Sequence, residues 1–285
     1  MRKVIILGDS RKEGVVDLIE QLKPLLKVHA KIAGEDLTGR MSLENIKADL
    51  VLVFGGDGLL LSTARRLGKN QIPVVGINVG KFGFLAELKI EELKTHFQKL
   101  LTKNLKVRER MMLDCRIIRN NKQMGSFIAL NDAVVTRGTI SRMLYVNLLI
   151  NDKYVTTFKG DGVIISTPVG STAHSLSSGG PVVHPDIDSF IVTSICPHSL
   201  SIRPLVIPPS HSIVLEIAKK PEEIVLTVDG QIFMYLHEND KLVVTKSQYR
   251  FKIVDTGIRT FYDTLVSKLN WKGSLDYAKD RDQKG

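Results

Sequence analysis

Four residues, Gly55-Gly56-Asp57-Gly58, join a short apolar run to a leucine-rich segment and constrain this chain more than any other feature. The run Leu50–Phe54 predicts a buried strand, and Leu59–Ala64 predicts a helix. Glycines at such a junction let the backbone approach a ligand closely, and the amides at the start of the helix favour a phosphate. A carboxylate at that place, Asp57, must handle a proton or act through a metal. The loop therefore indicates phosphoryl transfer more than simple binding.

Two common phosphate-binding patterns do not fit this loop. The dinucleotide pattern G-x-G-x-x-G requires a third glycine, but Gly56-x-Gly58 is followed by Leu61. The P-loop pattern requires Gly-Lys before Ser or Thr, whereas Gly80-Lys81 precedes Phe82. An ordinary turn in which Asp57 is the N-cap of the helix is the alternative interpretation.

Further motifs follow the loop in a fixed order: Asn78–Leu85, Asn131-Asp132, Lys159–Gly162, Thr167–Pro181, Cys196–Pro208 and Asp229-Gly230-Gln231. Together they resemble the NAD kinase family, also called ATP-NAD or polyphosphate/ATP-NAD kinases, from Val4 to about Leu269. The resemblance implies a phosphotransferase that uses ATP or polyphosphate to phosphorylate the 2′-hydroxyl of the adenosine ribose of NAD, giving NADP. It also implies Mg²⁺ or another divalent ion on the donor phosphates.

Composition favours a cytoplasmic enzyme over a nucleic-acid or membrane protein. The 285 residues are 43% hydrophobic and 25% charged, as in soluble globular proteins. Met1–Leu7 is too short for a signal-peptide core, no run is long enough to span a membrane, and two cysteines predict neither disulfides nor zinc. The net charge of +10 comes from scattered Lys and Arg, which predicts a solvated surface that attracts polyanionic substrates.

The pattern of elements changes midway and predicts two domains. Up to about residue 108, strand-like runs alternate with helical patterns, which predicts a Rossmann-like α/β domain: strands at Val4–Leu7, Val28–Ile32, Leu50–Phe54 and Pro73–Ile77, helices at Val15–Leu26, Leu59–Leu67 and Ile90–Thr102. Residues 109–260 contain many short Val- and Ile-rich runs, which predict a β-sandwich-like domain. The resemblance implies that this domain binds NAD. The resemblance implies that a helix at Phe261–Leu269 returns to the first domain, so that residues 261–285 are assigned to it.

The resemblance assigns roles to individual residues. Asp57 is expected to accept the proton of the ribose 2′-hydroxyl, and Gly58 to contribute a backbone contact. Asn131 and Asp132 are expected to bind NAD, and Asp161 to accept hydrogen bonds from it. Further predicted nucleotide contacts are Lys159, Thr172, Ala173, His174, Ser175, Leu176, Ser177, Phe82, Arg142 and Gln231. Thr172–Ser177 are also expected to begin a helix after the turn Pro168–Gly170. No protein metal ligand is named.

Two positions depart from the family pattern. His174 stands where a tyrosine is more common, which gives a smaller stacking surface that can titrate. Leu59 follows Gly58 where many relatives carry threonine. Diacylglycerol-type lipid kinases share the Gly-Gly-Asp-Gly loop and are the nearest enzymatic alternative, although they do not explain Gly170–Pro181.

Two alternatives from other classes are weaker. A non-catalytic NAD(P)-binding regulator gains nothing from an acid beside phosphate. A hydrolase built on Ser171 and His174 lacks the G-x-S-x-G elbow. The resemblance further implies a homodimer or homotetramer in which a neighbouring subunit completes the dinucleotide site, with Ser194–Ile195 as the matching segment.

Overall fold

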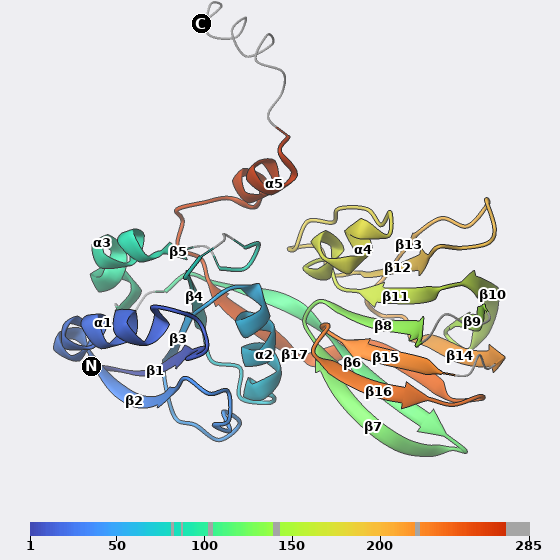
Figure 1. Ribbon diagram of the computed structural model, residues 1–285, viewed down its shortest axis with the longest axis horizontal. Helices are drawn as coiled ribbons and strands as arrows, with labels where there is room; N and C mark the ends of the chain where they lie inside the picture. The colour runs from blue at the N-terminus through green and yellow to red at the C-terminus, as the bar shows by residue number, and fades with distance from the viewer. Residues whose placement is uncertain (81–82, 87, 102–104, 139–142, 220–222, 272–285) are drawn as a thin grey trace, which may run out of the picture.

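The computed structural model describes residues 1–80, 83–86, 88–101, 105–138, 143–219 and 223–271. Its first half is built on parallel strands in the order β4-β3-β1-β2, with β5 added beside β4 (Figure 1). These strands are β1 (Arg2–Gly8), β2 (Ala30–Asp36), β3 (Leu50–Phe54), β4 (Val74–Asn78) and β5 (Leu88–Lys89). The helices are α1 (Val15–His29), α2 (Asp57–Leu67) and α3 (Ile90–Leu101).

Helices cover both faces of this parallel sheet. Alternate residues of a strand point to opposite faces, so the side chains of β3 pack into two different apolar clusters. Leu50, Leu52 and Phe54 pack with the apolar stripes of α1 and α3. Val51 and Val53 pack instead with the buried leucines of α2. Because both faces are buried, β3 reads as a continuous apolar run, as parallel strands do.

The second half is a β-sandwich. One layer continues the first sheet with antiparallel strands: β6 (Val107–Arg119), β7 (Lys122–Ala129), β9 (Leu144–Ile150), β10 (Lys153–Gly160), β14 (Ile213–Lys219) and β17 (Lys241–Val254). The other layer is antiparallel, in the order β13-β12-β11-β8-β15-β16. Its strands are β8 (Asp132–Arg137), β11 (Gly162–Ser166), β12 (Phe190–Ile195), β13 (Leu205–Ile207), β15 (Ile224–Val228) and β16 (Ile232–Leu236).

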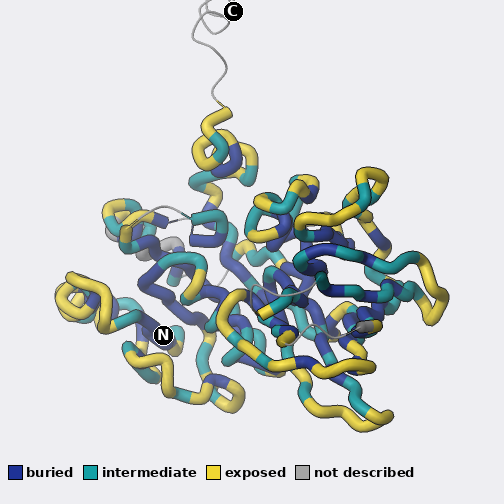
Figure 2. Tube along the Cα trace, turned by 45° about the vertical axis from the view of Figure 1, so that its right-hand side comes forward, coloured by how far each residue is buried: buried dark blue, intermediate teal, exposed yellow. Residues whose placement is uncertain are grey.

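The two layers share one apolar core, and burial is concentrated in the strands (Figure 2). The predicted architecture, an α/β half followed by a β-sandwich-like half, is confirmed. Strand β17 joins the halves, because it pairs with β6 over most of its length and with β4 through Ile253 and Val74. The division at residue 108 stays a prediction, since the hydrogen bonding of the large sheet continues across it.

The C-terminal helix α5 (Phe261–Leu269) has the predicted bounds. A capping box starts it, in which the Thr260 hydroxyl accepts a hydrogen bond from the Asp263 amide and the Asp263 carboxylate accepts one from Thr260. The preceding residue, Arg259, forms an ion pair with Glu92 of α3. The start of the helix is therefore tied to the first half of the chain, as the resemblance implies, and its Phe261 and Tyr262 rings also contact His184 of the second half.

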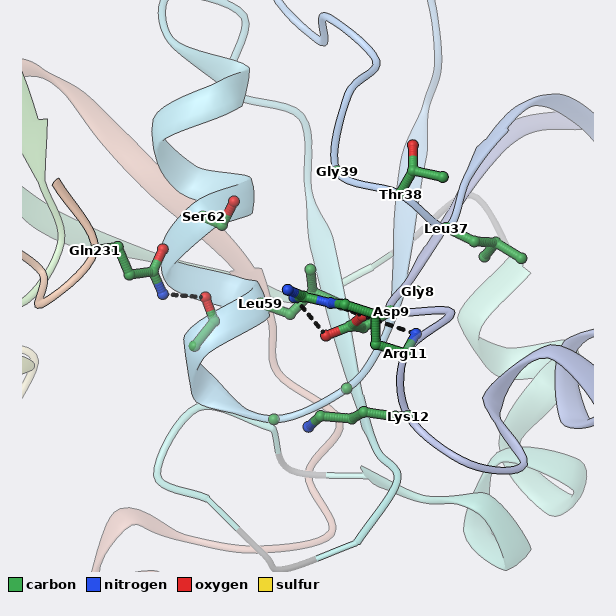
Figure 3. A pocket seen from close by; sticks show the side chains of 13 residues that line it. Gly8, Asp9, Arg11, Lys12, Leu37, Thr38, Gly39, Leu59, Ser62 and Gln231 are labelled. Atoms are coloured by element: carbon green, nitrogen blue, oxygen red, sulfur yellow. Dashed lines mark hydrogen bonds and ion pairs between the residues drawn. The ribbon is translucent and has the colours of Figure 1, made fainter.

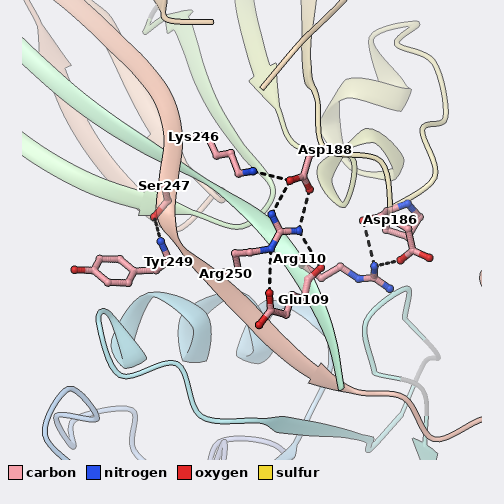
Figure 4. A network of polar contacts seen from close by, with 9 residues as sticks. Glu109, Arg110, Asp186, Asp188, Lys246, Ser247, Tyr249 and Arg250 are labelled. Carbon is pink, nitrogen blue, oxygen red and sulfur yellow. Dashed lines mark hydrogen bonds and ion pairs between the residues drawn. The ribbon is translucent and has the colours of Figure 1, made fainter. Parts of the chain in front are cut away.

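Ion pairs fasten the segment between α4 (His174–Ser177) and β12 onto the large sheet (Figure 4). The buried Arg110 of β6 donates to the Pro185 carbonyl at 3.1 Å and to Asp186. Arg250 of β17 lies 2.6 Å from an oxygen of Asp188. The pairs therefore hold the segment that follows the predicted NAD-binding residues against β6 and β17.

Two predicted elements differ from the structure. Val28 was expected in a strand but lies in the last turn of α1, where its side chain is exposed. The helix expected over residues 172–177 is two short turns, η1 (Gly170–Thr172) and α4, separated by Ala173. In the first turn the hydroxyls of Ser171 and Thr172 donate to nearby carbonyls, which competes with a continuous helix.

Candidate active site

Asp57 is the first residue of α2 and does not cap it. The N-cap is Gly56, and no side chain caps the helix. The Asp57 carboxylate turns instead to the loop before β5. Its Oδ2 accepts a hydrogen bond from the amide of Phe84 at 2.7 Å, and its Oδ1 accepts from Leu85 at 3.0 Å and Ala86 at 3.2 Å. The interpretation of Asp57 as an ordinary N-cap is therefore wrong.

This contact gives Asp57 a structural role that the sequence did not suggest. A Cβ placed on Gly83 would lie 2.0 Å from Asp57 Oδ1, so only glycine leaves room for the carboxylate there. A carboxylate offers about four acceptor positions. Three are used by the loop, and the remaining position is on Oδ2. That oxygen can still accept a proton.

A pocket of about 420 Å³ lies on the outer side of the glycine loop (Figure 3). It is lined by the carboxyl ends of parallel strands and the first turn of α2, which is where α/β folds bind ligands. Arg11 and Lys12 lie on one side of the helix start, and Gln231 lies on the other. Arg11 pairs with Asp9 at 2.9 Å. Two cations beside a helix N-terminus suit a polyphosphate.

Gln231, a predicted nucleotide contact, forms hydrogen bonds with other residues of the chain. Its Nε2 donates to the Gly58 carbonyl at 2.7 Å, and its Oε1 accepts from Arg65. Gln231 also lines the pocket. The turn after β15 is thereby attached to the first turn of α2, and its predicted role toward the nucleotide stays a prediction.

Asn131 and Asp132 lie at the start of β8, where a buried carboxylate holds the backbone. Asp229 Oδ1 accepts from the amides of Asn131 at 2.7 Å and Asp132 at 3.3 Å. Asp229 Oδ2 accepts from the Leu130 amide at 3.2 Å and from Arg65 Nη1 at 2.5 Å. The predicted NAD-binding pair is therefore connected to α2 through Asp229 and Arg65.

The two buried aspartates influence each other's protonation. Burial, reinforced by the negative charge of Asp229, raises the pKa of Asp132 to about 7. Burial also raises the pKa of Asp229, while Arg65 and the backbone amides act in the opposite direction. Because Asp229 has four donors around it, we assign the negative charge to Asp229, and Asp132 is the member of the pair that takes up a proton near neutral pH.

The segment Thr167–Gly170 lies directly against this pair. Thr167 donates its amide to the Asn131 carbonyl at 2.8 Å and its hydroxyl to the Leu130 carbonyl at 2.6 Å. Thr172 lines a small cavity together with Phe84 and Leu85, two residues whose amides hold Asp57. The structure thus brings Asp57, Asn131, Asp132 and Thr172 into one region.

Other predicted nucleotide contacts from the same segment differ in how far they are exposed to a ligand. Ser175 is fully buried, and its hydroxyl lies 2.9 Å from that of Thr193, so it is occupied within the protein. His174 and Ser177 are exposed, while Ala173 and Leu176 are half-buried. His174 is therefore open to a ligand and Ser175 is not.

Lys159 and Asp161 lie at the opposite end of β11. Gly162 pairs with Ile195, whereas Ser166 pairs with Asp132, and four residues of strand span about 13 Å. Asp161 forms an ion pair with Arg137 at 3.0 Å, and Lys159 Nζ lies 5.7 Å from the centroid of the Tyr145 ring. The structure does not bring these two residues to Asp57. Phe82 and Arg142 lie outside the described residues.

Several residues of the site were not predicted as such. Arg65, Asp229, Arg11 and Lys12 carry its charge, and Gly83 makes room for Asp57. Asp229 belongs to the motif Asp229-Gly230-Gln231, in which only Gln231 is a predicted nucleotide contact. Spacing could have indicated Arg65, because residues seven apart lie on one face of a helix and Arg65 follows Gly58 by that interval.

Comparisons with known proteins agree with the predicted resemblance. Residues 20–105 match the model of the ATP-NAD kinase N-terminal domain, and residues 130–256 match that of the C-terminal domain. An NAD kinase of Geobacter metallireducens is 37% identical over 95% of this chain and 99% of the relative. One of Clostridium botulinum is 40% identical over 83% of this chain and 84% of the relative.

Two solved structures share the fold. Yeast NADH kinase complexed with NADH has a TM-score of 0.86 at 25% identity, over 96% of this chain and 89% of the yeast chain. An NAD kinase from Archaeoglobus fulgidus in complex with ATP has a TM-score of 0.77 at 25% identity, over 95% of this chain and 99% of the other. The lipid kinase and the non-catalytic regulator gain no support from these similarities. This chain belongs to the NAD kinase family.

Proposed function

We propose that this chain transfers the γ-phosphoryl group of ATP to the 2′-hydroxyl of the adenosine ribose of NAD, giving NADP and ADP. The observation that carries the proposal is the position of Asp57. It stands in the glycine loop whose neighbours Gly56 and Gly58 line a pocket suited to a polyphosphate, and its carboxylate binds the amides of Phe84 and Leu85, which line a small cavity with Thr172. Family membership and the relatives with bound NADH and ATP support both substrates.

Asp57 Oδ2 is the proposed proton acceptor. The ribose 2′-oxygen forms a bond to the γ-phosphorus while the bond to the bridging oxygen breaks, and ADP leaves. The hydroxyl proton moves to the open position on Oδ2. Oδ1 meanwhile keeps its two amides and holds the carboxylate in place. General-base catalysis of this kind requires hydrogen-bond reach to the reacting hydroxyl.

The pocket beside the glycine loop is the proposed donor site. The positive end of α2 and the cations of Arg11 and Lys12 face the space that the phosphates would fill. A divalent ion such as Mg²⁺ neutralises charge on the donor phosphates when it is bound. Magnesium is usually held by one or two carboxylates plus phosphate oxygens, and Asp9 lines this pocket. Inorganic polyphosphate presents the same oxygens as ATP.

The acceptor site is proposed to extend beyond one subunit. Asn131, Asp132 and Thr172 are near Asp57, whereas Lys159 and Asp161 lie at the far end of β11 beside Ile195. In a dimer, the end of β11 that carries Lys159 and Asp161 in one subunit can lie beside Asn131 and Asp132 of the other subunit. Apolar side chains are exposed on both outer strands of the six-stranded sheet, including Val206 on β13 and Phe233 on β16.

Asp57→Asn tests the reaction and the base together. Wild-type protein with NAD, ATP and Mg²⁺ is expected to form NADP, and the variant to lose turnover by roughly 10²–10⁴-fold, because an amide does not accept the proton. NAD binding, measured by calorimetry, is expected to persist. Asp240→Asn is the control, since that carboxylate also accepts a backbone amide but belongs to a different pair. Near-normal turnover of a folded Asp57→Asn protein would contradict the proposed base.

Lys12→Ala tests the donor pocket. Loss of one cation from the phosphates is expected to raise the KM for ATP about tenfold, which corresponds to about 1.4 kcal/mol. The KM for NAD is expected to stay the same. Lys122→Ala, at the exposed first residue of β7, is the matched control. A rise in both KM values, or in neither, would place the donor elsewhere.

Asp132→Asn tests the raised pKa. A carboxyl group whose pKa rises from 3.8 to about 7 on folding stabilises the protein below pH 4 and loses that contribution as pH rises toward 7. The wild type is therefore expected to lose about 2 kcal/mol relative to the variant between pH 5 and pH 8, measured by urea unfolding. Asp152→Asn, at an exposed turn, is the control. Parallel pH profiles for wild type and Asp132→Asn would refute the assignment.

Subunit complementation tests the shared site. Light scattering is expected to give a dimer or tetramer. Asp57→Asn and Asp161→Ala proteins, each weak alone, are expected to recover about a quarter of wild-type activity when mixed as subunits, because half of randomly formed dimers are mixed and each has one intact site. An active monomer, or mixed oligomers without recovery, would contradict a site built from two chains.

A further inference from the structure

The contact between α2 and the turn after β15 has a feature that the reaction itself does not require. Three side chains form it: Arg65 of α2, and Asp229 and Gln231 of the turn. We call this group the Arg65 bridge. We propose that the Arg65 bridge is a positioning device that fixes the helix carrying Asp57 relative to the strand that holds NAD. The proposal rests on the function proposed above.

One end of the bridge is the acceptor strand. The Asp229 side chain is fully buried, and it accepts the amides of Leu130, Asn131 and Asp132. Those are the residues through which the chain enters β8. Its fourth acceptor position is filled by Arg65 Nη1 at 2.5 Å. A single carboxylate therefore joins the NAD-binding end of β8 to the side of α2.

The other end of the bridge is the first turn of α2. Arg65 uses its second nitrogen, Nη2, to donate to Gln231 Oε1, and Gln231 Nε2 then donates to the Gly58 carbonyl. Gly58 follows Asp57 directly. Since Gly58 and Arg65 are seven residues apart, they lie on one face of the helix about 10 Å apart. The bridge thus holds α2 at two points and opposes both sliding and rotation.

The planar guanidinium is what makes a two-point contact possible. Its donors form a fixed fork, whereas a lysine ammonium is a single compact charge. Adjacent Arg66 provides a contrast within the same helix, because it binds Asp36 and the Met41 carbonyl inside the first half of the chain. Neighbouring arginines of one helix therefore serve different halves of the protein, and Arg65 is the one that reaches the sandwich.

Energetics favour alignment over stability as the purpose of this bridge. A buried ion pair adds little to stability compared with apolar packing of the same volume, because both charges lose their water. Misplacement of reacting groups by about 1 Å, in contrast, can reduce a rate about 10²-fold. The Arg65 bridge joins the helix that carries Asp57 to the strand proposed to hold NAD, so it directly affects how accurately the reacting groups are placed.

Arg65→Gln and Arg65→Lys are the test variants, and Arg119→Gln is the matched control. Arg119 also pairs with a buried aspartate, Asp240, at 2.7 and 2.8 Å, but both residues lie within the sandwich half. For each protein we would measure kcat, the KM for NAD and ATP, the Kd for NAD by calorimetry, and the Tm. Wild-type NADP formation tests the proposed function separately, so a failure of that function is distinguishable from a failure of the bridge.

Arg65→Gln is expected to lower kcat between about tenfold and 10²-fold while the Kd for NAD stays close to that of the wild type. Its Tm is expected to fall no further than that of Arg119→Gln. Arg65→Lys keeps the charge beside Asp229 but not the fork, so it is expected to give an intermediate kcat. It also serves as the test if Arg65→Gln does not fold. Wild-type kcat in Arg65→Lys, or equal losses of kcat in Arg65→Gln and Arg119→Gln, would overturn the proposal.

Discussion

The proposed site depends on how the backbone amides of two loops find hydrogen-bond acceptors. No strand or helix supplies an acceptor for these amides, so side chains must do so. Two carboxylates each accept hydrogen bonds from three consecutive amides: Asp57 from residues 84–86, and Asp229 from residues 130–132. Buried amides must find an acceptor, so each carboxylate determines the path of a loop. Both loops lie at the proposed site. The acidic residues of the two glycine-containing motifs therefore determine the backbone path around the proposed site.

Contacts made by Asp229 and by β17 connect the two halves of different architecture at the proposed site. The parallel sheet supplies the helix that starts at Asp57, and the sandwich supplies the strand that starts at Asp132. Between them the Asp229 carboxylate contacts both, and β17 hydrogen-bonds to strands of both. Phosphoryl transfer depends mainly on positioning and electrostatics. A fold that joins the halves by directional bonds is suited to it.

Local patterns in the sequence predicted most of the elements, because apolar periodicity reports local burial. The bounds of β3 and α5 were predicted, and α2 begins two residues before its predicted start because Asp57 itself is helical. The contacts between halves could not be predicted in this way. Arg65 and Asp229 are 164 residues apart in sequence, and no local period relates them. The separation of Asp161 from Asp132 likewise follows from strand register, which a single amino-acid sequence does not specify.

The placement of β17 has a consequence for how the protein is synthesised. The start of β4 pairs on one side with β3 and on the other with β17, through Val74 and Ile253. Residues 241–254 leave the ribosome long after the parallel strands have emerged. Until then the β4 side of the nascent sheet has an unpaired edge, which is the kind of surface that promotes aggregation. Chain elongation, rather than local folding, therefore sets the time at which the large sheet can be completed.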